Sequence, residues 1–388
     1  MNWLTLKRLS SKSVETRVRA VQRLGEAMDA SWVEHLIVAL EDEDAEVRKA
    51  VCLALGNIRD ALAVDPLLNL LHDPHAKVRY AAIRALGRIG SRRAMDALVW
   101  RLNDPDKSVR KALLATLCEL GWEPAGPYER ALRAVADGKL REAARQGEVA
   151  IDLLVAELQD DLAFQRQAAA EALGHIRNVH VIRPLIAALR DPDPNVRVTA
   201  AHALANVGDE QVLDPLVKAT LDRDHRVRLA AAESLGKLGH AGFLEQFVCL
   251  LGDRSWQVRS AAAEALGRIE DGRVIAPLVS ALNDEDGDVR RTAALALGRL
   301  RDLRAIGPLV PLLADADMAV RLTVASALEQ IDSDWPSSET AQTAIPCLEA
   351  LVENEDYWIR HTAAETLNRI RPFSDAPPES EEPSANWG

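Results

Sequence analysis

The chain has 388 residues, of which 48% are hydrophobic and only 4% aromatic, and it carries a formal net charge of −12. No apolar run approaches the roughly 18 residues of a membrane span, so the sequence does not predict an integral membrane protein. The negative net charge argues against nucleic acid as the main partner, because a phosphate backbone requires an extended basic track.

A fixed spacing marked by one arginine organises almost the whole chain. The marker residues are Arg17, Arg48, Arg79, Arg110, Arg166, Arg197, Arg228, Arg259, Arg290, Arg321 and Arg360. Every step is 31 residues except the step from Arg110 to Arg166, which is 56, and the last step, which is 39. A period of this size predicts a stack of small units that contact only their neighbours, rather than one globular core.

Each unit is predicted to be a pair of helices. Residues 179–207 show the pattern: an apolar first helix from Val181 to Leu189, an Asp/Pro turn, and a second helix that begins near Asp193. Asp193 suits the N-cap and Pro194 suits the first helical position. In the second helix, positions +3, +4, +7 and +10 from the arginine are small or apolar in almost every unit, which predicts one buried face.

Two further expectations concern the second helix. Positions −2, +1, +2, +5 and +9 from the arginine are expected to point away from the buried face. Position +8 is glycine in seven of eleven units, and we expect this glycine to end the helix in the left-handed conformation.

The marker arginine itself is predicted to be structural. An aspartate lies six residues before it in nine of eleven units. Turn aspartates and helix arginines that recur together predict a ladder of charge-assisted hydrogen bonds between adjacent repeats. The ladder residues are Asp42, Arg48, Asp73, Arg79, Asp104, Arg110, Asp191, Arg197, Asp222, Arg228, Asp253, Arg259, Asp284, Arg290, Asp315 and Arg321.

The breaks in the spacing divide the chain into segments. We predict N-terminal repeats 1–4 over 2–119, an atypical helical insert over 120–150, and repeats 5–10 over 151–332. A loop over 333–343, a C-terminal capping repeat over 344–371 and a disordered, acidic, proline-rich tail over 372–388 follow. The insert is expected to change the direction of the stack near Trp122. The predicted fold class is an all-α superhelix of about eleven helix-pair repeats.

The apolar helix containing Pro-Leu, the D-x-D turn and the V-R-x-x-A-A-x-A-L-G helix together resemble HEAT repeats. More narrowly, they are similar to the short repeats of the E/F-type phycobilin lyases and their relatives. The resemblance covers roughly residues 2–371 and implies an α-solenoid. It implies several functions, because such repeats serve as scaffolds, chaperones, chromophore lyase subunits and binding modules.

One enzymatic relative within this resemblance can be tested on the residues. Deoxyhypusine hydroxylase holds two iron ions on His-Glu pairs that follow the repeat arginine. The matching positions here are Lys49-Ala50, Tyr80-Ala81 and Lys111-Ala112, and only His361, followed by Thr362, matches one half of a pair. We therefore predict no metal site, no cofactor and no catalytic residue, since no other metal or triad spacing is present.

The four cysteines lie far apart, at Cys52, Cys118, Cys249 and Cys347. Each falls on a predicted helix. This spacing favours buried free thiols in a reducing, cytoplasmic compartment over zinc or redox roles.

The charge distribution supplies the one candidate binding site. Residues 77–111 hold ten basic and three acidic residues. Lys77, Tyr80, Arg84 and Arg88 are predicted to share one helix face, with Arg92 and Arg93 in the following turn and Lys111 on the next second helix. The first explanation of these charges is a solvated surface that complements the helix dipole, and the functional alternative is a site for an anionic partner.

Several outward positions are predicted to be apolar, namely Phe164, Val198, Leu229, Leu322 and Trp358. Such residues are typical of protein-binding faces but are also ordinary when single.

These observations favour a non-enzymatic protein-binding scaffold or adaptor whose concave face holds a protein partner, with an acidic partner surface as one option. The alternative, implied by the resemblance, is a bilin lyase subunit or tetrapyrrole-handling chaperone. In that alternative Arg84 and Arg88 would meet propionates, and Tyr80 or Trp100 would meet the ring system. Nucleic-acid binding through residues 77–111 comes third.

Overall fold

The structure is a computed structural model that describes residues 7–239 and 241–370. The chain separates into two compact units, Met1–Val181 (unit 1) and Ile182–Gly388 (unit 2). Within the described residues all regular secondary structure is helical, so the predicted all-α repeat architecture is confirmed. The expectations for the first six residues and for the tail over 372–388 lie outside the described residues.

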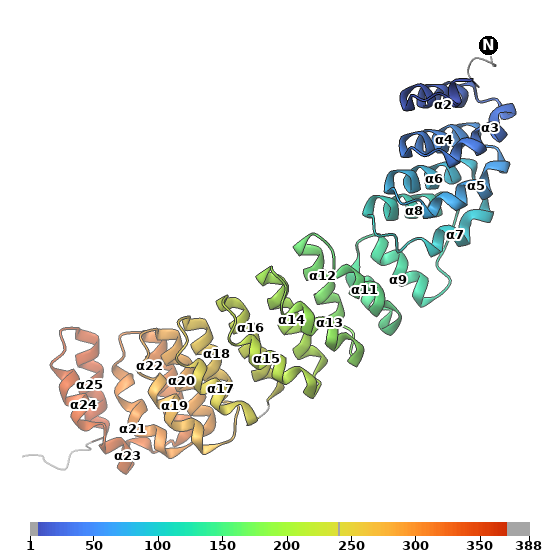
Figure 1. Ribbon diagram of the computed structural model, residues 1–388. Coiled ribbons are helices and arrows are strands. Elements are labelled where there is room, and N and C mark those ends of the chain that lie inside the picture. Colours follow the sequence, from blue (N-terminus) through green and yellow to red (C-terminus); the bar gives the residue numbers. More distant parts are fainter. Residues whose placement is uncertain (1–6, 240, 371–388) are drawn as a thin grey trace, which may run out of the picture. The chain divides into compact units, whose positions relative to one another are not determined.

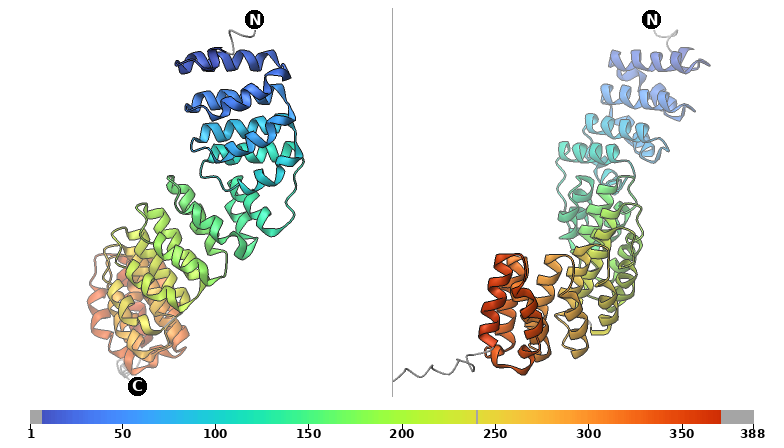
Figure 2. Two further views of the ribbon diagram at one scale, coloured as in Figure 1. Left: turned by 45° about the vertical axis from the view of Figure 1, so that its right-hand side comes forward. Right: turned by 90° about the vertical axis from the view of Figure 1, so that its left-hand side faces the viewer.

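In unit 1 the second helices of four repeats pack side by side, and the short first helices form another layer (Figure 1; Figure 2, left). The second helices are α2 (Val14–Ala27), α4 (Ala45–Ile58), α6 (Ala76–Ile89) and α8 (Lys107–Glu119). The first helices are α3 (Val33–Val38), α5 (Val64–Asn69) and α7 (Met95–Trp100). The insert forms α9 (Pro127–Ala136) and α10 (Leu140–Ala144), and α11 (Ile151–Glu157) and α12 (Ala163–Gly174) follow.

Unit 2 repeats the same arrangement of two layers (Figure 1). Its second helices are α14 (Pro194–Val207), α16 (His225–Leu238), α18 (Trp256–Leu266), α20 (Gly287–Leu300), α22 (Met318–Ile331) and α25 (Tyr357–Ile370). Its first helices are α13 (Ile182–Ala188), α15 (Leu213–Ala219), α17 (Leu244–Leu250), α19 (Ile275–Ala281), α21 (Ile306–Leu309) and α24 (Ile345–Val352).

Short 3-10 helices precede the first helices. In unit 1 they include η1 (Ala30–Trp32), η3 (Ala61–Ala63), η5 (Arg92–Ala94), η6 (Gly147–Ala150) and η7 (Val179–Val181). In unit 2 they include η8 (Glu210–Val212), η9 (Ala241–Phe243), η10 (Gly272–Val274) and η11 (Leu303–Ala305). Others, η2 (Ala39–Glu41), η4 (Leu70–His72) and η12 (Val310–Ala314), end a first helix.

The start of the second helix follows the sequence prediction. The Asp193 side chain accepts a hydrogen bond from the backbone N–H of Asn195, and Pro194 is the first residue of α14. Asp44 and Asp224 cap α4 and α16 in the same way. Each cap satisfies one backbone donor that the first turn of a helix leaves without a partner.

The second helix is buried on more of its circumference than the sequence predicted. Ala200, Ala201 and Leu204, at positions +3, +4 and +7, are fully buried, as expected. Position +2 is buried as well, at Ala81 and Ala230, although it was expected to point outward. The reason is that second helices such as α6 and α16 pack against their own first helices and also against the second helices on both sides. Only positions −2, +1, +5 and +9 remain on the open strip.

The glycine prediction was wrong. None of the +8 glycines has a positive φ among the described residues. A Cβ added to Gly25 would lie 2.7 Å from the Cα of Ala54, and one added to Gly298 would lie 2.9 Å from the Cα of Ala327. These glycines let the backbone of the next second helix approach closely. The left-handed residues come three positions later, at Met28, Arg59, Gly90, Gly208, Gly239 and Arg301.

Two other expectations need correction. The segment expected to be a loop over 333–343 contains η13 (Trp335–Ser337) and α23 (Glu339–Gln342). Trp335 is buried there, and the Arg369 guanidinium lies 4.9 Å from its ring centroid. The segment therefore packs against α21, α22 and α25, which a sequence rich in Ser and Thr does not reveal.

Only one of the four cysteines is buried. Burial raises the pKa of the Cys52 thiol to about 12, whereas Cys118, Cys249 and Cys347 are exposed. Cys118 occupies position +8 of α8. In other repeats that position faces the next second helix, but the insert follows α8 instead, and Cys118 is left at the surface.

The close helix approach makes a prediction about Gly267. In Gly267→Ala the new Cβ would lie 2.6 Å from the Ala296 Cβ and 2.8 Å from its Cα, so the helices must separate. We expect the free energy of unfolding to fall by about 1–3 kcal/mol, measured by urea denaturation with far-UV circular dichroism.

Gly236→Ala is the matched control, because its added Cβ would lie 3.2 Å from the Ala265 Cβ. There the gain in helix propensity, about 1 kcal/mol, offsets most of the crowding. Equal stability of the two variants would contradict the close-approach explanation.

Candidate functional site

The marker arginines join each repeat to the next one. In unit 1, Arg79 donates from Nε to Asp104 Oδ2 and from Nη2 to Asp104 Oδ1, both at 2.8 Å. In unit 2, Arg259 binds Asp284 through the same two atoms, both at 2.7 Å. The same two-bond pairing joins Arg48 to Asp73, Arg197 to Asp222, Arg228 to Asp253 and Arg290 to Asp315. Arg17 donates one hydrogen bond to Asp42, from Nη2 to Oδ1 at 2.9 Å, and its Nε lies 2.8 Å from Asp42 Oδ2 without forming a second one.

Each link also organises the turn at both of its ends. Arg79 Nη1 donates to the carbonyl oxygen of Asp73 at 2.9 Å, which fixes the turn of its own repeat. At the far end, Asp104 Oδ1 accepts from the backbone N–H of Asp106 at 2.9 Å. Asp106 in turn caps α8. The D-x-D turn therefore contains two different carboxylates, the first for the neighbouring arginine and the second for the helix N-terminus.

The regular link changes where the insert begins. Arg110 Nη2 lies 3.2 Å from Glu157 Oε1, so its carboxylate partner is a glutamate on α11 rather than a turn aspartate. Asp160, the turn aspartate of that repeat, pairs with Lys107 at 2.8 Å instead. The buried Nε of Arg110 has no hydrogen-bond acceptor among the described residues. At the insert, an ion pair between Arg110 and Glu157 thus takes the place of the two-bond Arg–Asp link.

The ladder stops at the last repeat of unit 2. Arg321 Nη1 donates to the carbonyl oxygens of Asp315 and Ala316 at 2.6 and 3.1 Å, and no described carboxylate pairs with it. Asn354 occupies the turn position of the final repeat. Its backbone carbonyl accepts from Arg360 Nη1 at 2.7 Å.

Burial and hydrogen bonding act in opposite directions on the ladder carboxylates. Burial by itself raises the pKa of Asp73, but the hydrogen bonds from Arg48 and from the His75 N–H outweigh burial, and the pKa lies below its ordinary value. The pKa values of Asp253 and Asp284 are lowered in the same way. At Glu157 burial is the dominant cause and raises the pKa, because the Arg110 charge offsets only part of it.

The structure divides the predicted basic site into two places in unit 1. Lys77, Tyr80 and Arg88 are exposed on the open strip of α6, and Arg84 is half-buried between them. Lys111 occupies on α8 the position that Tyr80 has on α6, so these five residues form one surface, which we call the basic face. Arg92 and Arg93 lie in η5, where Arg93 reaches back to Asp65 of α5 at 3.5 Å.

The described carboxylates neutralise only part of the basic face. Arg84 Nη1 lies 3.3 Å from Glu119 Oε1. Arg88 Nη1 donates to the neutral side chain of Asn57 at 2.6 Å. Lys77 and Lys111 have no ion-pair partner among the described residues. Three full positive charges are therefore exposed along α6 and α8.

The apolar candidates are not part of this face. Leu229, Leu322 and Trp358 belong to unit 2, on α16, α22 and α25. Leu229 and Val198 lie at position +1 but are half-buried, and Val198 packs against the core around Val227. Leu322 and Trp358 are 62% and 64% exposed. Phe164, in unit 1, is exposed and has Lys107 Nζ at 5.9 Å from its ring centroid.

A cavity of about 210 Å³ lies between α7 and the insert in unit 1. Its lining residues are Asp96, Val99, Trp100, Trp122, Tyr128, Glu129 and Leu132. The chromophore alternative expected Tyr80 or Trp100 to meet the ring system beside Arg84 and Arg88. Tyr80 lies on α6 with both arginines. The structure instead places Trp100 in a pocket whose charged lining residues are both carboxylates, which would repel propionates. The sequence analysis missed this pocket, although a tryptophan at a repeat position that is elsewhere small or polar was a usable signal.

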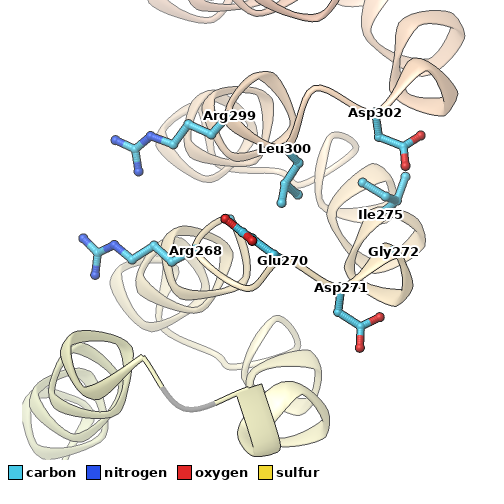
Figure 3. A pocket seen from close by; sticks show the side chains of 9 residues that line it. Arg268, Glu270, Asp271, Gly272, Ile275, Arg299, Leu300 and Asp302 are labelled. Carbon is cyan, nitrogen blue, oxygen red and sulfur yellow. The ribbon is translucent and has the colours of Figure 1, made fainter.

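Unit 2 contains a larger and more open cavity of about 510 Å³ (Figure 3). The Arg268 and Arg299 side chains extend in parallel from neighbouring repeats, with Glu270 between them and Asp271 and Asp302 farther along. Asp271 and Asp302 are paired with Arg273 and Arg304, each at 2.7 Å. The mixture of charges gives this cavity no single preferred ligand class.

Across 7–239 and 241–370, no three His, Cys, Asp or Glu side chains are grouped so that they could hold a metal ion. None of the helices in these ranges is both long enough and apolar enough to cross a membrane.

Helix pairs stacked at a fixed period and joined by a repeating Arg–Asp link define an α-helical repeat protein. The sequence model of HEAT repeats matches residues 4–75, 64–147, 151–236, 218–288, 243–329 and 308–379. The chain therefore belongs to the HEAT-repeat family.

Two solved structures are similar to this chain. One is an engineered protein with 24% identity and a TM-score of 0.31, over 95% of this chain and 98% of that chain. The other is human deoxyhypusine hydroxylase in complex with glycerol, with 23% identity and a TM-score of 0.29, over 76% of this chain and 94% of that chain. A comparison with curated protein sequences finds no match.

A ladder pair and an exposed surface ion pair should respond differently to loss of the carboxylate. Asp104→Asn leaves the buried Arg79 charge without its partner, and we expect unit 1 to lose about 3–5 kcal/mol of stability at neutral pH. The exposed pair of Glu46 and Lys49 is the control, since Glu46→Gln should change stability by less than about 0.5 kcal/mol. Urea unfolding measures both. A loss of the same size in both variants would contradict a special role for the ladder.

Loss of the Glu157 carboxylate should have the opposite effect on stability to loss of the Asp104 carboxylate. Its pKa is raised in the folded state, so the ionised carboxylate at neutral pH opposes folding. We expect Glu157→Gln to be at least as stable as the wild type at pH 7. The difference should shrink as the pH falls through the pKa of Glu157.

The wild-type ladder should instead weaken only below about pH 4, where aspartates with lowered pKa take up protons. The midpoints of urea unfolding, measured across a pH series, test both expected directions of the pH dependence of stability. A loss of stability in Glu157→Gln at pH 7 as large as that in Asp104→Asn would contradict the opposite signs expected for the two carboxylates.

Proposed function

We propose that the protein is a non-enzymatic binding scaffold and that the basic face of unit 1 holds an acidic segment of a protein partner. The observation that carries this proposal is the exposed and incompletely neutralised positive charge on α6 and α8. Lys77, Arg88 and Lys111 retain full charges at the surface. The ladder, by contrast, already uses the buried charges of Arg79 and Arg110 for structure.

The shape of the basic face favours a short acidic segment. From Lys77 to Arg88 the strip extends over about 16 Å, given 1.5 Å per helical residue. Tyr80 lies within it and offers an amphipathic contact of the kind that is common in protein interfaces. Complementary charge at such a surface speeds association and selects among partners.

The same geometry argues against nucleic acid as the occupant. In the repeat before α6, the position that corresponds to Arg88 is Asn57, and in the repeat after α6 it is Glu119. At this position, therefore, the positive charge does not continue onto either neighbouring second helix. A phosphate backbone would require a longer track, and the chain as a whole carries a net charge of −12.

A charge-reversal experiment tests the proposal. The triple variant Lys77→Glu, Arg88→Glu and Lys111→Glu removes the exposed cations and leaves the ladder and the Arg84 pair in place. Proteins captured from the source cells by the wild type would be purified, and the affinity of each would be measured against the wild type and the variant at two salt concentrations. We expect at least tenfold weaker binding by the variant and a wild-type affinity that falls with salt.

The matched control is Lys218→Glu, Lys237→Glu and Arg299→Glu in unit 2. These three residues are exposed and have no ion-pair partner among the described residues. The control should bind within about twofold of the wild type. Equal affinity of all three proteins would refute the basic face as the binding site, and a visible pigment in the captured fraction would favour the chromophore-handling alternative.

A further inference from the structure

The pocket between α7 and the insert contains an aromatic residue that the fold does not need. Trp100 is 75% exposed, so it contributes little to the core. In the other repeats the same position holds small, polar or aliphatic residues, namely Val38, Asn69, Ala156, Ala187, Lys218, Cys249, Ser280 and Pro311. An exposed tryptophan is therefore specific to the repeat that faces the insert.

The insert supplies the other aromatic walls of this pocket. Trp122 is nearly buried, at 7% exposure, and Tyr128 at the start of α9 is 42% exposed. Three aromatic side chains thus line one cavity in a chain with only 4% aromatic residues. Aromatic faces attract cations through the negative charge density above the ring.

The charged groups of the pocket have the matching sign. Asp96 has no hydrogen-bond or ion-pair partner among the described residues. The other carboxylate of the lining is Glu129, whose Oε2 accepts from the Ala125 N–H at 2.8 Å. No lysine or arginine lines the cavity.

The acidic residue at position 96 also has a structural explanation. Asp65 and Asp214 occupy the same position in other repeats, where an acidic residue in the first helical turn complements the helix dipole. The pocket is therefore distinguished by the combination of an unpaired carboxylate with Trp100 and the aromatic residues of the insert, and not by Asp96 alone.

We propose that this pocket binds the side chain of an arginine from a segment of a partner protein. A volume of about 210 Å³ lies below the roughly 300 Å³ at which small-molecule sites begin, so it suits one side chain. A guanidinium group is planar and weakly hydrated, stacks on aromatic faces, and forms paired hydrogen bonds with carboxylates. Lysine is more strongly hydrated and gains less from stacking.

This inference shares with the proposed function the premise that the protein binds other proteins, but it uses none of the residues of the basic face. The two proposals can therefore fail separately. The triple variant of the basic face should retain arginine binding in full.

Fluorine NMR of the full chain labelled with 5-fluorotryptophan tests the proposal. The probe is the blocked peptide Gly-Gly-Arg-Gly-Gly, and its citrulline and lysine counterparts are the comparisons. We expect saturable shifts of the Trp100 and Trp122 resonances with a dissociation constant on the order of 1 mM, because a single cation–aromatic contact with carboxylates is weak. The exposed Trp358 of unit 2 should not shift and serves as the internal control.

The neutral citrulline peptide should bind at least tenfold more weakly, and the lysine peptide should also bind more weakly than the arginine peptide. Asp96→Asn should weaken arginine binding several-fold, whereas Asp214→Asn, which removes the same charge at the same repeat position of unit 2, should not change it. Trp100→Ala should abolish the shift of the Trp122 resonance.

Equal binding of the arginine and citrulline peptides would overturn the proposal, as would an unchanged affinity in Asp96→Asn. Equal binding of the lysine peptide would overturn the preference for arginine. Absence of any shift at Trp100 and Trp122, with the protein folded, would show that the pocket does not bind this group.

Discussion

The link between a marker arginine and the turn aspartate of the next repeat is the interaction on which the rest of each unit depends. Arg79 illustrates it: one guanidinium binds the carboxylate of Asp104 and also the backbone carbonyl of Asp73. The arginine thereby connects two turns, and each turn begins a second helix. Because desolvating two charges costs nearly as much as their attraction returns, the benefit of such a link lies in geometry as much as in energy. It fixes how neighbouring helix pairs are aligned.

Much of this architecture could be predicted from the sequence, because the same residue types recur at the same positions in eleven repeats. Asp193 and Pro194 indicate a helix start, because an aspartate suits the N-cap and a proline suits the first helical position. Aspartate N-caps recur in other turns. The role of Gly267 could not be predicted in this way. A glycine near a helix end suggests a left-handed stop, and only the position of Ala296 on the next helix reveals that backbone contact is the reason. The burial of Ala81 could not be predicted for the same reason. The role of Gly267 and the burial of Ala81 both depend on residues of neighbouring helices.

The candidate sites show the same limit. The charges of the basic face were visible as a local excess of Lys and Arg, and the structure shows which of them are already used. Arg93 turns toward Asp65, while Lys111 joins the face on α6 and α8. The pocket beside Trp100 depends on Trp122 and Tyr128, which belong to a segment without repeat periodicity. No periodic pattern could bring these residues together, because the insert interrupts the 31-residue spacing of the ladder.

The spacing of the ladder also bears on how such a chain can change in length. Each regular link reaches 25 residues forward, from the second helix of one repeat to the turn of the next. Duplication or loss of a complete 31-residue segment would leave every remaining arginine at the right distance from an aspartate. An insertion or deletion of any other length would leave one arginine without its aspartate. Arg110 is in this position, and Glu157 of α11 replaces the aspartate there. The ladder therefore acts as a molecular ruler that permits growth by whole repeats.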